Sequence, residues 1–309
     1  MDKGFMAPLG VAFQIGPISV HWYGILISFA FALGIYLAYR ETLRQRRDPD
    51  HLFNILLLLI PAAVIGARAY YVLFQWQWYA AHPEKILATW EGGLAIHGGV
   101  IAGILVILLY CYKKRQDFLL WADILSPSLI LGQAIGRWGN FANAEAYGPV
   151  ISPGSFWSWV PLQVMADGAA HHPTFLYESV WNALIFIVLL VLIRRDHRIG
   201  YIFASYLIFY SLGRFFIESL RADSLMLGSL RVAMLVSVIG VLAGAFLLSW
   251  IRCRPVIDVS QPPDAKAKKA SPNTEALPGE KGKTAVPKPK GAATKPAGAG
   301  KKAGKRRKA

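Results

Sequence analysis

The stretch LFNILLLLIPAAVIGARAYYVLF, residues 52–74, decides the fold class of this 309-residue chain. It is long enough for a helix to cross a bilayer core, which takes about 20 apolar residues. Six further apolar segments lie at about 20–39, 93–112, 121–136, 174–193, 199–220 and 230–251. With 55% hydrophobic residues and a mean hydropathy of +0.39, the chain is too apolar for an ordinary soluble domain. The sequence therefore predicts an all-α polytopic membrane protein with about seven transmembrane helices.

The fourth apolar segment, 121–136, is short and carries polar or helix-breaking residues. It contains Asp123, Pro127 and Gln133. Backbone and side-chain polar groups facing lipid would find no partner. We therefore expect neighbouring helices to shield this segment on most sides, and we expect Asp123, near its inner end, to have a structural role.

Basic residues place the ends of the chain relative to the membrane. Arginine and lysine clusters follow the first, third and fifth apolar segments, and a basic tail follows the seventh. Because cytoplasmic loops carry the excess of Lys and Arg, the N-terminus is expected outside and the C-terminus in the cytoplasm. The first segment lacks a basic leader and a cleavage site, so it is expected to be a retained anchor. Residues 149–172 then form an external loop or small head.

The net charge of +15 lies mainly in the tail. From Ser260 onward there are fourteen Lys and Arg against three acidic residues, in a sequence rich in Pro, Gly and Ala. Such a composition cannot bury enough apolar surface to fold. We expect a membrane-embedded domain over residues 1–254 and a disordered basic tail over 255–309. The tail is expected to contact anionic lipid headgroups; nucleic acid is the less favoured partner.

Polar residues gather in the outer half of the predicted bundle. They come from six different segments: Tyr23, Arg68, His97, Arg137, Glu178, and the set Tyr210, Arg214 and Glu218. Charged groups are costly in a bilayer and usually line a cavity or a substrate site. The outer half of the bundle is thus the place to look for a binding site.

Tyr210, Arg214 and Glu218 are spaced by four residues and share one helix face. In one interpretation Arg214 and Glu218 only neutralise each other so that the helix can insert. In the other, Arg214 acts together with Arg137 at the same depth, because guanidinium groups suit the oxygens of phosphate. An anion site in the outer half favours a phospholipid headgroup as the ligand.

His97 lies between two glycine pairs in the stretch GGLAIHGGVIAG. A single histidine in an apolar span is commonly a packing element, and glycines allow helices to approach closely. Its company of arginines at the same depth favours the second interpretation, a general base or proton shuttle.

Five motifs of the membrane part resemble those of the bacterial phosphatidylglycerol:prolipoprotein diacylglyceryl transferase family. They occur in matching order across residues 10–254: HWYG at 21–24, HGG at 97–99, GRWGNFANAEAYG at 136–148, HPTFLYES at 172–179 and YSLGRFFIES at 210–219. The resemblance implies an enzyme of the bacterial cytoplasmic (inner) membrane that carries out the first step of lipoprotein maturation. Its partners would be phosphatidylglycerol and pre-prolipoprotein signal peptides with a lipobox cysteine.

The resemblance also implies a reaction and roles for the polar residues. The diacylglyceryl group passes from phosphatidylglycerol to the lipobox thiol, which forms a thioether and releases glycerol 1-phosphate. Arg137 and Arg214 are expected to neutralise the phosphate. His97 is the first candidate for the base that takes the thiol proton, and Tyr210 is the second. The remaining expected substrate-binding residues are Tyr23, Arg68, Asn140, Asn143, Glu145, Gly148 and Glu218.

Other functional classes find less support in the sequence. There is no HExxH, CxxC or GxGxxG motif, so we expect no metal and no cofactor. A secondary transporter of an anionic solute stays the alternative, although the repeated halves with paired interrupted helices that many transporters show are not visible. A rhomboid-type protease would need a serine nucleophile in a GxSG-like turn, which the chain lacks.

Overall fold

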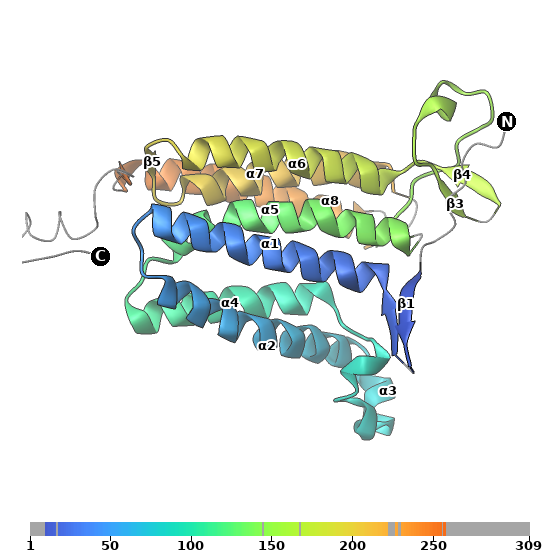
Figure 1. Cartoon of the computed structure of the whole chain (residues 1–309), viewed down its shortest axis with the longest axis horizontal. Helices are drawn as coiled ribbons and strands as arrows, with labels where there is room; N and C mark the ends of the chain where they lie inside the picture. Colours follow the sequence, from blue (N-terminus) through green and yellow to red (C-terminus); the bar gives the residue numbers. More distant parts are fainter. Residues whose placement is uncertain are drawn as a thin grey trace, which may run out of the picture. The chain divides into compact units, whose positions relative to one another are not determined.

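The protein is a bundle of long helices. The computed structural model describes residues 10–16, 18–143, 145–166, 168–221, 226–227, 230–254 and 256–257. Its long helices are α1 (Trp22–Arg44), α2 (Pro49–Phe74), α4 (Ile96–Lys114), α5 (Phe118–Ala142), α6 (Thr174–Ile193), α7 (Tyr201–Ser219) and α8 (Val232–Trp250) (Figure 1). All of these except α7 are long and apolar enough to cross a membrane, which gives 6 candidate spans in the described part of the chain. The mainly helical fold with several candidate membrane spans is confirmed.

Short elements join the ends of the long helices. They are the helix α3 (Trp76–Ala81) and antiparallel pairs formed by β1 (Val11–Ile15) with β2 (Ile18–His21), β3 (Val164–Ala166) with β4 (Ala169–His171), β5 (His197–Arg198) with β8 (Val256–Ile257), and β6 (Met226–Leu227) with β7 (Leu230–Arg231). The first two pairs and α3 lie at one end of the bundle, and β5 lies at the other (Figure 1). The expected external region 149–172 includes β3 and β4. None of these strands was expected from the sequence.

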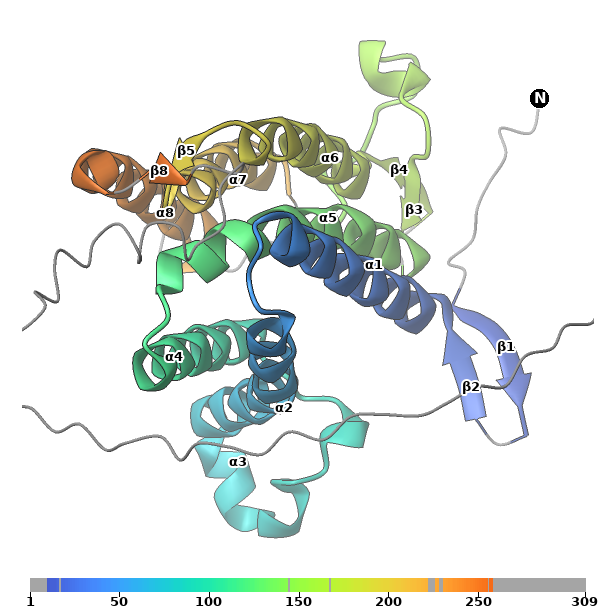
Figure 2. The same cartoon turned by 60° about the vertical axis from the view of Figure 1, so that its left-hand side comes forward.

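The long helices form two groups, a larger one of α1, α5, α6, α7 and α8 and a smaller one of α2 and α4 (Figure 2). Helix α5 lies at the centre of the larger group. It packs against α1, α6 and α7 (Figure 2). Half of its most apolar window is buried, against 33% or less for the other candidate spans. The shielding expected for this polar segment is therefore confirmed, while its length was underestimated: the helix runs to Ala142 rather than to about 136.

Helices α2 and α4 form a closely packed pair. A methyl group placed on Gly99 of α4 would lie 3.2 Å from the backbone carbonyl oxygen of Ala63 on α2, and the pair also brings Gly98 against the backbone of Gly66. Small residues at such crossings let backbones approach closely. The glycines of this part of the chain thus serve helix packing.

Local signals in the sequence explain where helices begin. Asp48 precedes Pro49 and its Oδ1 accepts a hydrogen bond from the backbone N–H of Asp50 at 2.9 Å. Asp117 does the same for the backbone N–H of Leu119 at the start of α5. Both are N-cap residues that satisfy otherwise unpaired donors.

Asp123 caps a helix other than its own. It is fully buried, and its carboxylate accepts hydrogen bonds from the backbone N–H groups of Gly200, at 2.6 Å, and Phe203, at 2.8 Å. The carboxylate therefore binds the positive N-terminal end of α7. This is the structural role expected for Asp123.

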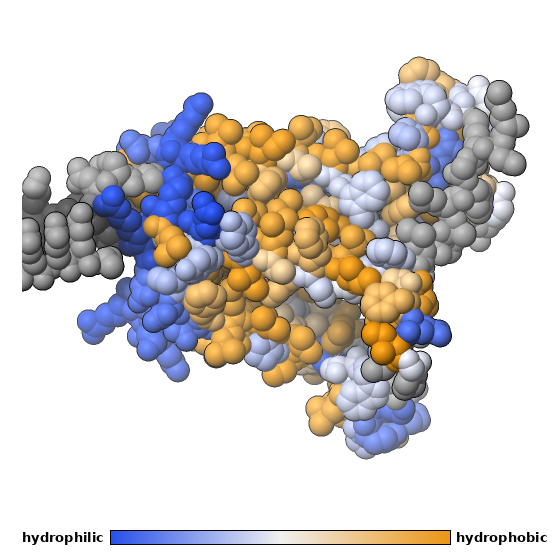
Figure 3. Space-filling view, viewed as in Figure 1, coloured by the Kyte–Doolittle hydropathy of each residue, from blue (hydrophilic) through white to orange (hydrophobic). Residues whose placement is uncertain are grey.

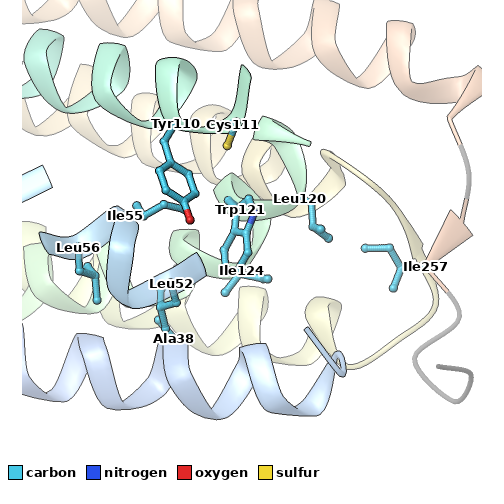
Figure 4. Packing of buried hydrophobic residues seen from close by; sticks show 10 residues of the cluster. All are labelled: Ala38, Leu52, Ile55, Leu56, Tyr110, Cys111, Leu120, Trp121, Ile124 and Ile257. Carbon is cyan, nitrogen blue, oxygen red and sulfur yellow. The ribbon is translucent and has the colours of Figure 1, made fainter. Parts of the chain in front are cut away.

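The surface of the bundle is apolar around the helices and hydrophilic at one end. Hydrophobic residues cover the helix surfaces in Figure 3, and hydrophilic residues gather where α1, α4 and α6 end. A core cluster lies near that end: Trp121 of α5 packs with Tyr110 of α4 and with Leu52 and Ile55 of α2 (Figure 4). The basic tail expected at 255–309 lies outside the described residues, apart from Val256 and Ile257.

Candidate functional site

Glu178 is the centre of a charged cluster at the end of the bundle opposite the basic end. It lies in the first two turns of α6 and is 2% exposed. Nη2 of Arg137, from α5, lies 2.5 Å from its Oε1. Nη1 of Arg214, from α7, donates a hydrogen bond to its Oε2 at 2.7 Å. One buried carboxylate thus fixes arginines that come from two other helices.

A second buried carboxylate, that of Glu218, extends the cluster toward the end of α7. It is 2% exposed and lies 2.7 Å from Nη2 of Arg214 and 3.9 Å from Nε of Arg221. Arg231, at the end of β7, donates a hydrogen bond to the backbone carbonyl of Glu218. The Arg214–Glu218 pair expected under the neutralising interpretation is therefore formed. Among the described residues, three guanidinium groups, those of Arg137, Arg214 and Arg221, lie within 4 Å of these two carboxylates.

The polar stretch that begins at Gly136 is helical as far as Ala142, the last residue of α5. Arg137 and Asn140 lie on the last turns of α5, and Nη1 of Arg137 is 3.5 Å from Oδ1 of Asn140. A methyl group on Gly139 would lie 2.5 Å from the ring of Tyr23, so glycine allows α1 to place that ring against α5. Close packing by this small residue lets α5 continue to Ala142, beyond the apolar segment 121–136.

The chain after α5 folds back onto the cluster. Asn143 donates a hydrogen bond to Oε1 of Glu145 at 3.2 Å, and both side chains are exposed. Gly148 is buried: its backbone N–H donates to the carbonyl of His172 at 2.9 Å, and its own carbonyl accepts from Nδ1 of His171 at 2.8 Å. A methyl group on Gly148 would come within 3 Å of its neighbours. Gly148 therefore acts through backbone packing.

Tyr210 connects the cluster with a polar layer deeper in the bundle. It forms a hydrogen bond with Arg137, and its ring stacks on that of Tyr206 at 5.7 Å between centroids. Nε2 of Gln133 in turn donates to the hydroxyl of Tyr206 at 3.1 Å. These contacts restrain Tyr210 on two sides.

Arg68 is placed apart from this cluster. It is 7% exposed, and its guanidinium group donates to four backbone carbonyls, those of Lys85, Ile86, Gly92 and Gly93. All of them belong to the segment between α3 and α4. The structure thus shows Arg68 organising this loop.

His97 also lies apart from the cluster, on the pair formed by α2 and α4. It is the second residue of α4, its side chain is exposed, and its ring contacts that of Tyr70 on α2 at 6.1 Å between centroids. Within the described part of the chain it forms no hydrogen bond with the residues around Glu178. Helix α1, which carries Tyr23, packs against both α5 and α2 and so connects the two groups.

The structure thus brings together Arg137, Asn140, Tyr210, Arg214 and Glu218 of the expected residues. Glu178 was expected among the polar residues of the outer half of the bundle, but not among the site residues. The signal was present, because Glu178 lies within one of the five motifs, HPTFLYES. The contacts of Arg221 and Arg231 with Glu218 were not predicted either.

The electrostatics of the cluster suit an anion better than a cation. The side chains of Arg137 and Arg214 keep 19% and 16% exposure, so each stays partly accessible. Guanidinium groups bind carboxylate or phosphate oxygens through two parallel hydrogen bonds. In the described residues no group of three or more His, Cys, Asp or Glu side chains is placed to hold a metal ion.

Comparison with known proteins gives a consistent result. Residues 10–250 match the family model described as prolipoprotein diacylglyceryl transferase. The chain is 45% identical over 276 residues to a phosphatidylglycerol–prolipoprotein diacylglyceryl transferase of Trichormus variabilis, which covers 85% of this chain and 97% of that protein. It is 46% identical over 248 residues to the protein of the same name from Bacillus licheniformis, with 78% of this chain and 92% of the relative covered. A third relative with this name, from Symbiobacterium thermophilum, is 46% identical over 253 residues and covers 79% of this chain and 93% of its own length.

Proposed function

This chain belongs to the prolipoprotein diacylglyceryl transferase family, and we propose that the charged cluster around Glu178 is the place where it binds and cleaves its lipid substrate. The protein is a membrane transferase of lipoprotein maturation, which moves the diacylglyceryl group of phosphatidylglycerol to a prolipoprotein. Family membership decides against the transporter that the sequence alone left as an alternative.

We also propose how the helices are oriented in the membrane. Helix α7 is the seventh span, and its lower apolarity follows from Arg214 and Glu218, which pair within the bundle instead of facing lipid. The N-terminus lies outside and the C-terminus in the cytoplasm of the bacterial inner membrane, because basic residues gather where α1, α4 and α6 end. The Glu178 cluster then lies in the outer half of the membrane.

The proposed reaction is a displacement at the carbon of the diacylglyceryl group to which the phosphate is attached. The sulfur of the lipobox cysteine bonds to this carbon while the carbon–oxygen bond breaks. The electron pair of that bond goes to the phosphate oxygen, and glycerol 1-phosphate leaves. The thiol proton passes to a base and from there to solvent or to the departing phosphate. The product is a thioether, and charge increases on the phosphate in the transition state.

The arginines supply what this step requires. Arg137 and Arg214 are held in place by Glu178 before substrate arrives, and preorganised positive charge stabilises a developing anion without having to reorganise. The single observation that carries the proposal is this convergence of two partly exposed arginines on one buried carboxylate. Glu218 forms a second ion pair with Arg214.

Other expected residues surround the arginines. Tyr23, Asn140 and Asn143 orient the headgroup, and Glu145 accepts hydrogen bonds from glycerol hydroxyls. Gly148 shapes the wall through its close packing. Arg68 acts through the loop between α3 and α4, whose carbonyls it binds, and this loop borders His97.

His97 is the proposed base, since its ring is exposed and free to accept a proton from an incoming thiol. Because it lies on the α2–α4 pair while the phosphate site lies on α5, α6 and α7, the substrates would meet between the two helix groups. Tyr210 is less suited, because stacking on Tyr206 and the hydrogen bond to Arg137 restrain it.

The exposed side chains of Phe156, Trp157 and Trp159 in the external region offer apolar surface to a signal peptide. The basic tail is proposed to touch anionic headgroups.

The test uses purified full-length protein, phosphatidylglycerol labelled in its headgroup glycerol, and a lipobox peptide. Wild type should release labelled glycerol phosphate and add a diacylglyceryl group to the cysteine, as seen by mass spectrometry. Arg137→Ala and Arg214→Ala should lose both products, whereas Arg46→Ala, at the opposite end of the bundle, should keep them. His97→Gln should lose transfer and still bind the lipid. Normal turnover in either cluster variant would reject the assignment of the phosphate to this cluster.

A further inference from the structure

A groove at the basic end of the bundle lies far along the helices from the Glu178 cluster. It has a volume of about 980 Å³ and is bounded by the last turn of α4, the first turn of α5, and the end of α8 with Arg254. The Glu178 cluster, in contrast, uses the last turns of α5 and α7 and the first turns of α6. The two places lie at opposite ends of the same helices and share no residue.

The groove combines a positive rim with apolar walls. Lys113, Arg115 and Arg254 line it together with a single acidic residue, Asp117. Asp117 is already engaged: it caps α5 and pairs with Arg254, whose Nη1 lies 2.6 Å from its Oδ2. No described acidic side chain pairs with Lys113 or Arg115, and both are exposed. The rim therefore offers uncompensated positive charge.

The walls beneath this rim suit acyl chains. Phe118, Leu119 and Trp250 contribute apolar surface, and Trp250 is 52% exposed with the guanidinium group of Arg254 over its ring at 4.5 Å. Tryptophan prefers the depth of the headgroups, where one side of the ring meets lipid and the other meets polar groups. Only 11% of the most apolar window of α8 is buried, so lipid reaches the groove from the side.

We propose that this groove binds the headgroup of an anionic phospholipid of the inner leaflet, at a site separate from the one where the reaction takes place. Basic pockets between membrane helices on the cytoplasmic side bind anionic headgroups. Arg115 and Lys113 contact the phosphate, and the acyl chains lie against Trp250. The tail of the same chain is a poor occupant, because its fourteen Lys and Arg after Ser260 would be repelled by the rim.

The binding test uses full-length protein in phosphatidylcholine nanodiscs that contain a small amount of photoactivatable phosphatidylserine. This probe is anionic but does not carry the headgroup of the substrate, so labelling of the groove is separated from labelling of the reaction site. Peptides containing residues 111–119 and 250–254 should be labelled after illumination. A photoactivatable phosphatidylcholine should not label them, unlabelled phosphatidylglycerol should compete, and inorganic phosphate should not.

The decisive variant is Lys113→Gln with Arg115→Asn. Arg115 has a left-handed backbone with φ of 52°, which asparagine tolerates, so the end of α4 is preserved. Removing both charges should lower labelling about thirty-fold, which corresponds to about 1 kcal/mol for each basic residue near the membrane surface. The matched control is Arg46→Asn with Arg195→Gln, because Arg46 has the same φ, both residues are exposed, and neither lines the groove.

Any of three labelling results would overturn the proposal: equal labelling by the phosphatidylcholine probe, labelling unchanged in the groove variant, or an equal loss in the control. Competition by inorganic phosphate would also reject a lipid as the ligand. If the double variant fails to fold, Lys113→Gln alone carries the same test, since Lys113 is exposed and has no described partner whose loss would disturb the helix.

Discussion

Replacing Glu178 with glutamine tests the organisation of the charged cluster most directly. The change keeps the shape of the side chain and removes its charge. Glu178 is 2% exposed and contacts Arg137 and Arg214 at 2.5 and 2.7 Å. Because both arginines depend on this one carboxylate, the variant should affect stability and activity together.

The magnitude follows from the burial of the partners. Removing one member of a buried ion pair costs about 3–5 kcal/mol, because the other charge is left uncompensated. Here the two arginines keep 19% and 16% exposure, and Arg214 retains Glu218, so the loss of stability should be about 2–3 kcal/mol. Displaced arginines should also lower turnover by about 100-fold, which corresponds to about 2.7 kcal/mol of transition-state stabilisation.

The assay compares thermal unfolding in detergent with glycerol phosphate release at saturating phosphatidylglycerol. Glu145→Gln is the stability control, because the carboxylate of Glu145 is exposed and its loss should change stability by less than about 0.5 kcal/mol. The double variant of Glu178→Gln and Arg137→Gln should be less destabilised than the sum of the two single variants. If Glu178→Gln unfolds and turns over like wild type, the carboxylate does not organise the arginines and our reasoning is refuted.

Three further predictions concern packing, capping and pH. Gly139→Ala should reduce turnover without unfolding the protein, because the added methyl group would lie 2.5 Å from the ring of Tyr23; parallel activity and circular-dichroism measurements check this. Asp123→Asn should lower the melting temperature, with a stability loss of about 1–3 kcal/mol, because one buried acceptor of two backbone N–H groups becomes an amide. Burial lowers the pKa of His197, whose Nδ1 donates to the carbonyl of Arg195, so protonation favours the unfolded chain and stability should fall as the pH drops below about 6.5. His197→Asn should flatten the melting temperature between pH 7 and pH 5, and an unchanged slope would exclude this residue as the cause.

The membrane fold could be predicted because apolar length is a direct physical requirement of a bilayer. The fourth apolar segment shows what hydropathy alone cannot predict. Hydropathy marked only residues 121–136, yet α5 continues to Ala142, because Gly136 and Gly139 pack against α1 instead of breaking the helix. Such tertiary contacts are not visible in a hydropathy pattern. The short strand pairs were missed for a similar reason, since strands of two to five residues give too little alternation to be recognised.

The candidate site was predictable in composition more than in geometry. The four-residue spacing of Tyr210, Arg214 and Glu218 placed them on one face, and the Arg214–Glu218 contact forms. The sequence could not show that Glu178 joins Arg214 to Arg137, because that contact depends on how three helices pack. Nor could it show that His97 lies on a different helix pair.

Asp123 fixes the first turn of α7 in place, because its carboxylate accepts hydrogen bonds from two backbone N–H groups there. Arg214 lies thirteen residues beyond Tyr201, the first residue of α7, or about 20 Å along the axis. A tilt of about 5° at the fixed end would therefore move the guanidinium group by roughly 1.7 Å, and misplacement by about 1 Å can cost 100-fold in rate. The carboxylate of Asp123 thus helps to position an arginine near the opposite end of α7. Evolutionary or engineered changes at the first turn of this helix should therefore also change the position of Arg214.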